Sequence, residues 1–283
     1  MWERPSLLVG MVSQVCAILK NIEILNFALT LEHLEAAFYK QGLMKYSKKA
    51  FKKAGHPGWV RGRFQQIAEH EKAHVQFLTS AITAAGAQAV EACEYQFPDT
   101  DPNSFIDTAY ALESVGVSAY NGAAAFINNK AYLTVAASIL GVEARHSAWI
   151  NSAARNSNPW STAFETPLDL NQVFSIASGF IKKCPNSNPP LPVKAFPSLV
   201  VSNYSLGKPA HAKFDCKGQK GLFAAFLLGT GTIFTPIKDG IFEIDIPKEL
   251  KCWVYVVVTN DGGKVSDETI VAGPAILNFP CGA

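Results

Sequence analysis

The sequence contains no long apolar run and no strong charge of either sign. No stretch reaches the roughly 18 apolar residues that a membrane-spanning helix needs. The 25 lysines and arginines nearly balance the 23 acidic residues, and the net charge of +2 gives no reason to expect nucleic acid or an anionic membrane as a partner. With 283 residues, 48% of them hydrophobic, the chain is long enough for one large or two medium globular domains.

Several common site motifs are absent as well. The cysteines include no Cys-x-x-Cys pair, which argues against a zinc knuckle or a thioredoxin-like site. No Ser/His/Asp arrangement with a nucleophile elbow is present. The stretch GTGT at 229–232 falls between predicted strands, so a phosphate loop is not predicted. The stretch at 98–103 lacks the glycine and the terminal glutamate of a calcium loop.

Cysteine usage indicates an oxidising compartment. Four of the six cysteines fall in the last part of the chain: Cys184, Cys216, Cys252 and Cys281. This suits one or two disulfides, whose connectivity the sequence leaves open. Residues 1–20 are either a signal-like segment or a first helix that packs on the domain, because their apolar run has the length of a signal core but no clean cleavage site follows. We expect the protein to be secreted.

Up to about residue 155, apolar residues recur every three or four positions, the pattern of core-facing helices. Four such stripes run over residues 25–43, 64–82, 109–127 and 135–150. A connection of about twenty residues with two prolines separates the second stripe from the third, whereas the third and fourth are joined by a short link at 128–129. The sequence therefore predicts a four-helix bundle with one long crossover. The pair Ser104 and Asp107 predicts the cap at the start of the third helix.

Beyond residue 189 the pattern changes to short runs of β-branched and aromatic residues, separated by glycine and proline. About seven strands at this spacing predict a small immunoglobulin-like β-sandwich. The segment before them is rich in proline and asparagine and is typical of a linker. The predicted organisation is a helical bundle over 21–183, a linker over 184–192 and the sandwich over 193–283.

Each predicted helix carries a glutamate on its apolar stripe, where a leucine would pack better. The second and fourth helices carry it in a Glu-x-x-His pattern, and the first and third carry a glutamate alone. This is the ligand set of a carboxylate-bridged dimetal site, in which oxygen ligands bind hard cations and one imidazole completes each ion. Cations would remove the cost of burying four carboxylates. The predicted ligands are Glu32, Glu71, His74, Glu113, Glu143 and His146.

The helical half also repeats itself. Tyr39 lies seven residues after Glu32, and Tyr120 lies seven residues after Glu113. Each helix with such a Glu/Tyr pair is followed by a helix with a Glu-x-x-His pattern. Two copies of one helical hairpin would surround a pseudo-twofold axis. The tyrosine hydroxyls could then hydrogen-bond ligand carboxylates and assist catalysis, or the rings could be core aromatics. Glu35 lies one step off the stripe and could be an additional ligand or a helper.

Other polar residues near these motifs have simpler interpretations. Glu69, His70 and Lys72 flank the stripe and are predicted to lie on a solvated face, as is His33 on the first helix. A bundle that keeps the six residues as a buried polar network, without metal, remains an alternative to the metal site.

Five stretches together resemble a known family: ILNFALTLEHLEAAFY, AEHEKAHVQFL, the helix around Glu113, GVEARHSAWIN and SDETIVAGPAILNF. They look like the secreted ferritin-like family that includes fungal stress-response and plant desiccation-related proteins. The resemblance implies a ferritin-like bundle, usually exported and associated with stress or development. Together with the strand pattern, it gives the expected fold class: α+β multidomain, a ferritin-like four-helix bundle followed by a small immunoglobulin-like β-sandwich.

Two functions remain open from the sequence. The first is a dimetal oxidoreductase, in which two Fe or Mn ions react with peroxide or dioxygen as the small-molecule substrate. The second is a metal-sequestering or structural protein of stress or desiccation, without turnover. A storage cage is disfavoured because an appended sandwich and export do not suit a closed cytosolic shell. A homodimer is compatible with the sequence, and no partner is predicted for the sandwich.

Overall fold

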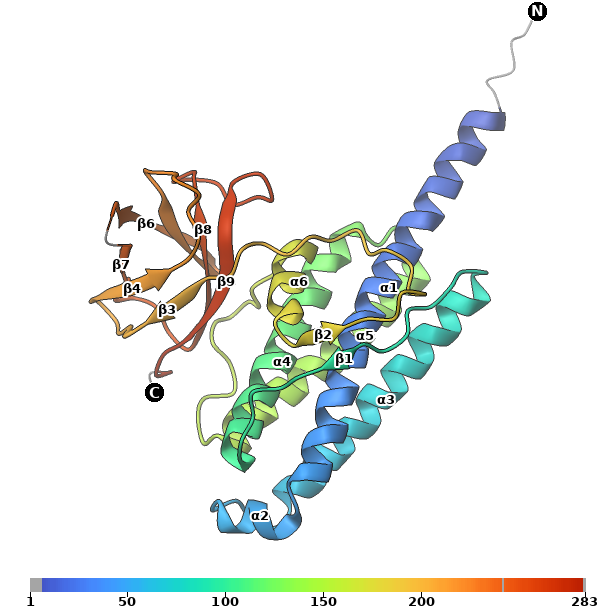
Figure 1. Cartoon of the computed structure of the whole chain (residues 1–283). Helices are drawn as coiled ribbons and strands as arrows, with labels where there is room; N and C mark the ends of the chain where they lie inside the picture. Colours follow the sequence, from blue (N-terminus) through green and yellow to red (C-terminus); the bar gives the residue numbers. More distant parts are fainter. Residues whose placement is uncertain (1–6, 241, 282–283) are drawn as a thin grey trace, which may run out of the picture.

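The computed structural model describes residues 7–240 and 242–281, with side chains described from Asn21 onward. The first part of the chain is a bundle of four long helices (Figure 1). Their bounds are α1 Leu7–Lys45, α3 Val60–Ala84, α4 Pro102–Ala123 and α5 Lys130–Trp149. α1 packs along α3, α4 packs along α5, and α1 also meets α4 across the bundle. These are the four helices that the apolar stripes predict.

The start of α1 contains part of the segment for which two interpretations were open. Residues 1–6 of the predicted signal-like segment or packing helix lie outside the described residues, and from Leu7 the backbone is helical and continuous with α1. Both interpretations of residues 1–20 therefore stay predictions. None of the described helices is both long and apolar enough to cross a membrane.

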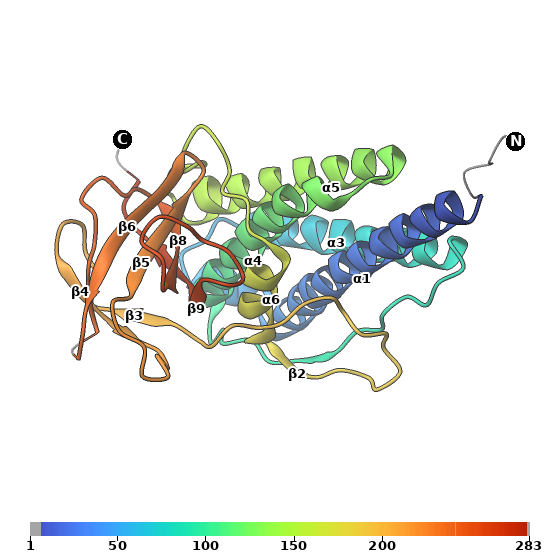
Figure 2. The same ribbon diagram turned by 90° about the horizontal axis from the view of Figure 1, so that it is seen from above.

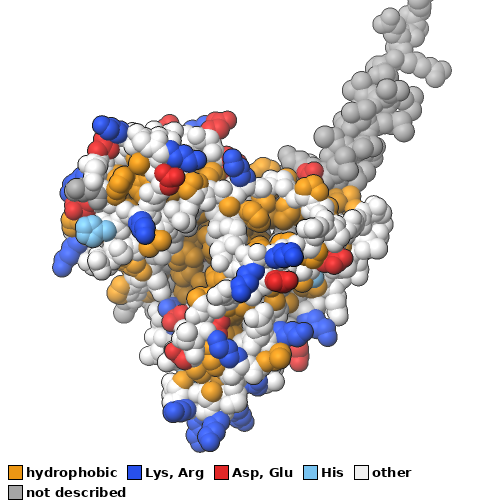
Figure 3. All heavy atoms as spheres, viewed as in Figure 1, with side chains coloured by type: hydrophobic (Ala, Val, Ile, Leu, Met, Phe, Trp, Pro, Cys, Tyr) orange, Lys and Arg blue, Asp and Glu red, His pale blue; other side chains and the backbone are white. Residues whose placement is uncertain are grey.

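A short helix that the sequence did not predict turns the chain between α1 and α3. This helix, α2 (Lys48–Lys53), begins with the Ser47 hydroxyl accepting a hydrogen bond from the Ala50 N–H, and it is anchored by Phe51, which is 1% exposed. Its four lysines face outward and form the basic cluster at the lower end of the molecule in Figure 3. Shorter turns extend the last two long helices: a 3-10 turn, Ala124–Phe126, and a π turn, Ile150–Ala154.

α4 begins one turn before the predicted cap. The Asp101 carboxylate accepts hydrogen bonds from the N–H groups of Asn103 and Ser104, at 2.8 and 3.0 Å. The Ser104 hydroxyl accepts one in return from the Asp101 N–H, at 3.0 Å. This is a capping box with Pro102 in the first turn. The predicted cap of Ser104 with Asp107 is wrong, because Ser104 is the inner partner of the box.

The crossover between α3 and α4 is fastened to a later part of the chain. Its strand β1 (Glu94–Tyr95) pairs antiparallel with β2 (Ile181–Lys183), which follows helix α6 (Leu170–Ser178). A disulfide joins Cys93 to Cys184 beside this pair. The start of the predicted linker is therefore tied to the crossover, and two segments distant in sequence run side by side along the bundle (Figure 2).

The second part of the chain is an antiparallel sheet of seven strands in the order β3-β4-β7-β6-β5-β8-β9. Their bounds are β3 Val200–Ser202, β4 Pro209–Lys213, β5 Phe223–Leu228, β6 Gly231–Lys238, β7 Glu243–Asp245, β8 Trp253–Thr259 and β9 Ile270–Asn278. The sheet curls until its two edges meet, where the Gly273 N–H of β9 donates to the Pro197 carbonyl just before β3, at 2.9 Å. The predicted immunoglobulin-like sandwich is not confirmed, because one hydrogen-bonded strand order runs around a near-barrel. A second disulfide joins Cys252 to Cys281.

One face of this sheet packs on the helical bundle and the other encloses its own core. In β8, Tyr255 and Val257 belong to the core of the bundle, whereas Val254 and Val256 belong to the core inside the sheet. Alternate side chains of a strand point to opposite faces, so a strand buried on both faces has an unbroken apolar sequence. The Tyr255 hydroxyl donates to the Ser114 carbonyl of α4 at 3.1 Å. The sheet thus braces α4 directly.

Removing this hydroxyl tests the bracing contact. Tyr255→Phe also removes a 2.9 Å hydrogen bond between the Tyr255 and Ser118 hydroxyls. Because both partners are buried, we expect the free energy of unfolding to fall by about 1–3 kcal/mol. The measurement is urea unfolding, with Tyr204→Phe as the control, since that hydroxyl accepts only a 3.4 Å bond from Asn278 within the sheet domain. Equal losses in the two variants would contradict a special role for the contact with α4.

Candidate metal centre

Four glutamates meet at the centre of the bundle, one from each long helix. Glu32 lies on α1, Glu71 on α3, Glu113 on α4 and Glu143 on α5, and all four are 0% exposed. Each occupies a core-facing position of an amphipathic helix, which is why the sequence pattern singles it out. An ionised carboxylate is buried only where a cation or hydrogen-bond donors compensate for the lost water. The centre of the bundle must therefore supply such partners.

The ligand atoms fall into two groups that share two residues. In each group, the candidate atoms lie within 4.8 Å of one another. The first group is Glu32, Glu71, His74 and Glu143, and the second is Glu71, Glu113, Glu143 and His146. Glu71 and Glu143 belong to both groups. The structure thus brings together all six residues predicted from the sequence, with two carboxylates common to both groups.

Both histidines direct the same ring atom at the carboxylates. The His74 Nδ1 lies 3.1 Å from Glu71 Oε2 and 3.2 Å from Glu32 Oε2. The His146 Nδ1 lies 3.1 Å from Glu113 Oε2 and 3.2 Å from Glu71 Oε1. The two halves are related by the internal repeat of the sequence. A metal ion in each group would therefore meet Nδ1 of one histidine.

The two shared glutamates have buried oxygens that accept no well-formed hydrogen bond from a described residue. Among the described residues, Glu71 Oε1 and both carboxylate oxygens of Glu143 are buried and accept no hydrogen bond of good geometry, although a histidine Nδ1 lies 3.2 Å from Glu71 Oε1 and 3.3 Å from Glu143 Oε1. Buried oxygen atoms in native proteins rarely lack a partner. Divalent cations prefer such oxygens as ligands, so the donor set fits a pair of Fe or Mn ions. These oxygens lie on the residues that two ions would share.

The two tyrosines reach across the bundle to the outer glutamates. The Tyr39 hydroxyl of α1 donates to Glu113 Oε1 on α4. The Tyr120 hydroxyl of α4 donates to Glu32 Oε1 on α1, at 2.5 Å. Each tyrosine therefore binds the glutamate of the other repeat, and leaves the second oxygen of that carboxylate facing a histidine. Of the two interpretations left open by the sequence, these contacts favour tyrosines that hydrogen-bond the glutamates; a role in catalysis stays a prediction.

Glu35 lies beside the same centre but outside the two ligand groups. It is 4% exposed, and a Cβ placed on Gly116 would stand 3.1 Å from Glu35 Oε1 and 3.2 Å from Glu143 Oε2. Gly116 lies as many residues after Glu35 as Glu113 lies after Glu32, so the two pairs occupy equivalent positions of the internal repeat. One repeat therefore supplies a fifth carboxylate, and the other supplies the glycine that makes room for it. Whether Glu35 binds a metal ion stays a prediction.

His70 is a site residue that the sequence did not reveal. It is exposed, as expected for the solvated face, but its ring stacks on His146 with 5.1 Å between ring centroids. Its Nδ1 lies 2.9 Å from His146 Nε2, the ring nitrogen that faces away from the carboxylates. A hydrogen bond to that nitrogen fixes the orientation and tautomer of a ligand histidine. The contact joins α3 to α5, so the spacing of residues within either helix does not predict it.

His33 also differs from its predicted place on the surface. Its ring is half-buried, and its Nε2 lies 3.1 Å from the carbonyl of Val90 in the crossover. It therefore helps to seat the crossover on α1 and takes no part in the carboxylate cluster.

The cluster binds protons strongly when it is free of metal. Burial raises the pKa of Glu32 to about 7. Burial, together with the charges of neighbouring glutamates, raises the pKa of Glu35 and of Glu143 well above the usual range. Burial alone would lower the pKa of His74, but the close approach of its Nδ1 to the carboxylates of Glu143, Glu32 and Glu71 outweighs burial and raises the pKa to about 12. The same balance, led by Glu113, raises the pKa of His146 to about 10.

Comparison with known proteins agrees with this architecture. Residues 20–156 match the family model described as the ferritin-like domain. This part of the chain is a ferritin-like domain. The ferritin-like domain contains all four long helices from residue 20 onward and the six candidate ligands. It is followed by the mostly antiparallel sheet domain.

One relative extends the similarity beyond the ferritin-like domain. The chain is 27% identical over 206 residues to "Protein rds1" of the fission yeast Schizosaccharomyces pombe, covering 73% of this chain and 48% of that protein. The chain thus spans about half the length of this curated relative. A structure described as "ferritin like, diiron-carboxylate proteins from Bacillus anthracis str. Ames" is also similar, at 17% identity, a TM-score of 0.41, 48% of this chain and 95% of that chain.

The protonation of the ferritin-like domain predicts how the metal-free protein responds to pH. The folded-state pKa of Glu32 is raised from 4.5, so its contribution to stability is complete below pH 4.5 and is lost as the pH rises through about 7. The folded-state pKa values of His74 and His146 are raised from 6.5 to about 12 and about 10, respectively. Their contributions to stability are therefore complete below pH 6.5 and are lost as the pH rises towards those values. We therefore expect the melting temperature in EDTA to fall steadily from pH 5 to pH 9. Added Mn²⁺ should reverse the fall at high pH, and a melting temperature that rises with pH would contradict the buried cluster.

Two substitutions separate the stacking of His70 from its hydrogen bond. His70→Phe keeps a ring on His146 but removes the hydrogen bond, and we expect it to weaken metal binding by about 10- to 100-fold. His70→Asn returns an oxygen close to the position of Nδ1 and should recover most of the affinity. The measurement is Mn²⁺ titration followed by electron paramagnetic resonance. Equal affinity in His70→Phe and the wild type would show that the contact does not orient His146.

Proposed function

We propose that the protein is a dimetal carboxylate oxidoreductase, which binds two Fe or Mn ions and acts on peroxide or dioxygen. The observation that carries the proposal is the sharing of Glu71 and Glu143 between two buried ligand groups. An isolated divalent ion needs only one such group. Two groups with common carboxylates suit a pair of ions that exchange electrons with one substrate molecule.

The donor set assigns each residue a place around the ions. Glu32 and His74 would hold one ion, Glu113 and His146 the other, and the two shared glutamates would bridge them. Iron or manganese, once bound, supplies the change of oxidation state that peroxide or dioxygen requires. Two divalent cations also balance the charge of four carboxylates, which the apolar bundle otherwise disfavours.

The tyrosines keep the outer carboxylates in a fixed orientation. Tyr120 binds Oε1 of Glu32, and Oε2 of the same residue is the atom that faces His74. In the same way, Tyr39 binds Oε1 of Glu113, and Oε2 of that residue faces His146. Each outer glutamate thus presents one oxygen to the centre and cannot rotate without losing a buried hydrogen bond. A site held this firmly favours catalysis, because ligands need not reorganise.

A second candidate is a protein that sequesters metal without turnover, in stress or desiccation. The full burial of all four glutamates supports it, since an enclosed site retains ions well. Both candidates accord with export. The two disulfides, Cys93–Cys184 and Cys252–Cys281, support an oxidising, extracellular location, and a role in stress would follow from removal of peroxide or of free metal.

Metal content and turnover together test the proposal. We expect two ions per chain in protein purified from its native host, and loss of both in Glu71→Gln, because that residue belongs to both ligand groups. Glu69→Gln is the matched control, since Glu69 is exposed on the same helix. Loaded protein should consume peroxide or oxidise ferrous ion. Two bound ions without either activity would favour sequestration, and no bound metal would refute both candidates.

A further inference from the structure

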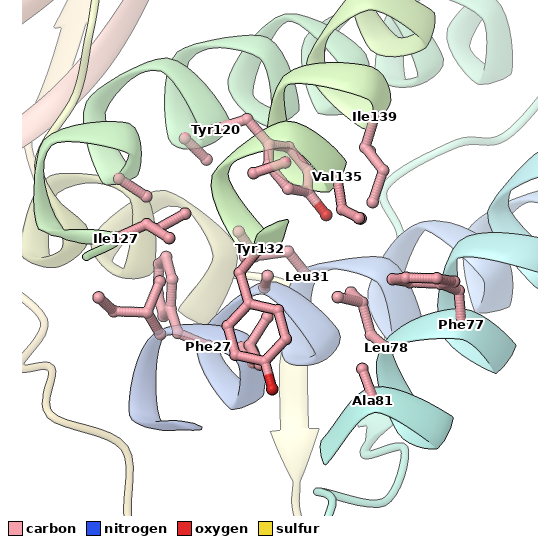
Figure 4. Close-up of a pocket in the computed structure, with 16 residues that line it drawn as sticks. Phe27, Leu31, Phe77, Leu78, Ala81, Tyr120, Ile127, Tyr132, Val135 and Ile139 are labelled. Atoms are coloured by element: carbon pink, nitrogen blue, oxygen red, sulfur yellow. The ribbon is translucent and has the colours of Figure 1, made fainter. Parts of the chain in front are cut away.

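The interior of the helical bundle is nearly filled beside the candidate metal centre. Between the four long helices, Tyr120, Phe77 and their apolar neighbours leave a space of about 30 Å³, which is room for a water molecule or two (Figure 4). A larger partner of the ferritin-like domain would therefore bind to its outer surface.

Positive charge is concentrated at one end of this bundle, although the net charge of the chain is small. Residues 36–68 contain eight of the 25 lysines and arginines and no acidic residue. The other 250 residues therefore carry 17 basic residues against all 23 acidic ones. The net charge of +2 is thus the sum of a strongly basic segment and an acidic remainder. Such an uneven distribution is typical of proteins that bind an anionic partner.

The short helix α2 is the centre of the basic segment. All of its lysines are exposed, and none of them forms an ion pair with a described residue: Lys48, Lys49, Lys52 and Lys53. Lysines four positions apart lie on one helical face, so like charges repel each other within this helix. The described residues supply no counter-charge for this repulsion, and an external anionic surface would relieve it.

The rest of the fold holds this basic end in one arrangement. Phe51 anchors α2 in the core, and the His56 N–H that follows α2 donates to the Phe51 carbonyl at 3.0 Å. The Arg61 side chain of α3 donates to the carbonyls of Leu43 and Tyr46 at the end of α1, at 2.7 and 2.8 Å. The lysines are therefore presented together on a fixed helix, and binding need not order a flexible loop.

Two exposed apolar side chains accompany the lysines. Met44, in the last turn of α1, is 78% exposed, and Trp59, just before α3, is 50% exposed. The Lys48 Cε lies 3.8 Å from the position that a Cβ on Gly58 would take, so the lysines of α2 and the segment of Trp59 are neighbours. The contacts of Arg61 bring the end of α1 to the same place. Basic residues together with exposed apolar side chains are typical of sites that bind a membrane surface.

We propose that this basic end, residues 40–63, docks the protein on the surface of a bilayer that contains anionic phospholipids. A hydrated polyanion, such as nucleic acid or an acidic polysaccharide, would attract the lysines but leave Met44 in water. An anionic bilayer accounts for both features, because its headgroups attract lysine and its interface accepts methionine and tryptophan. Six of the eight basic residues are lysines, whose compact charges suit a diffuse anionic surface, whereas arginine suits bidentate recognition.

Docking by this end would leave most of the protein away from the bilayer. In Figure 1, α2 forms the lower tip of the molecule, and the sheet domain lies above it and to the left. The basic cluster occupies the same lower end in Figure 3. The proposal goes beyond the proposed function and does not require metal to be bound.

Sedimentation with lipid vesicles tests the docking on the full-length protein. One set of vesicles contains phosphatidylcholine and phosphatidylserine in equal parts, and the other contains phosphatidylcholine alone. We expect binding to the first set only, with an affinity that falls steeply as salt is added, because salt screens exposed charges. Equal binding to both sets, or binding to neither, would overturn the proposal.

Matched substitutions locate the contact. Lys49→Gln combined with Lys53→Gln removes two charges from one face of α2, and glutamine keeps the helix propensity of lysine. Lys220→Gln combined with Lys251→Gln removes the same charge from exposed positions of the sheet domain and is the control. A lysine near an anionic bilayer contributes about fivefold in affinity, so we expect the α2 pair to lose roughly 25-fold. Equal losses in the two pairs would overturn the proposal.

Two further variants distinguish a bilayer from a polyanion. Met44→Gln should weaken binding to the phosphatidylserine vesicles and leave any binding to heparin unchanged. Lipids brominated in their acyl chains should quench the tryptophan fluorescence of the bound protein. This quenching should be lost in Trp59→Phe and kept in Trp160→Phe, because Trp160 is 70% exposed but lies outside the basic end. Heparin binding without quenching by brominated lipid would assign the basic end to a polyanion and overturn the proposal.

Discussion

The burial of four carboxylates at the centre of an apolar bundle is the constraint on which the rest of the structure depends. Desolvation and mutual repulsion both disfavour four negative charges there, and only protons, hydrogen-bond donors or cations offset them. The described donors are two histidines and two tyrosines, which leave oxygens of Glu71 and Glu143 without a hydrogen bond of good geometry. Four helices must therefore keep a fixed register, since a shift of one residue would turn a glutamate from the centre into the apolar packing.

The two halves of the internal repeat meet this requirement through hydrogen bonds to one another. Each tyrosine binds the glutamate of the other half, so neither hairpin completes its own centre. The symmetry is nevertheless broken where it affects chemistry. Glu35 faces Gly116 across the pseudo-twofold axis, and His70 supports His146. The two groups of candidate ligands consequently have different surroundings, with a fifth carboxylate beside Glu143 and an outer imidazole behind only one of the two described candidate histidines.

The sequence predicts the helices and the six candidate ligands because both leave a local pattern. A glutamate on an apolar stripe is visible at helical spacing, and a Glu-x-x-His pair is visible within one turn. His70 left no such pattern, since its partner lies on another helix 76 positions away. The arrangement of the strands was equally hidden. Tyr255 and Val256 belong to one apolar run in the sequence, although they contribute to different cores. The alternation of side chains does not indicate which strands lie at the sheet edges or whether those edges meet. The same sequence pattern is therefore compatible with a sandwich and with a curled sheet. The predicted cap of α4 lies one turn too far along the chain, because Ser104 can serve either as the first or as the inner residue of a capping box.

The seams between the four long helices are covered in different ways. α6 lies over the seam between α1 and α4, where Ile176 and Phe180 pack above Glu35. The sheet domain braces α4 through Tyr255, and the crossover follows α1. The seam between α3 and α5 is closed differently, by the stacked rings of His70 and His146 at the level of the metal centre and by Phe77 farther along. These are side-chain contacts, which move on faster timescales than helices or domains. Rotation of these side chains would therefore open this seam while the helices that position the four glutamates stay in place.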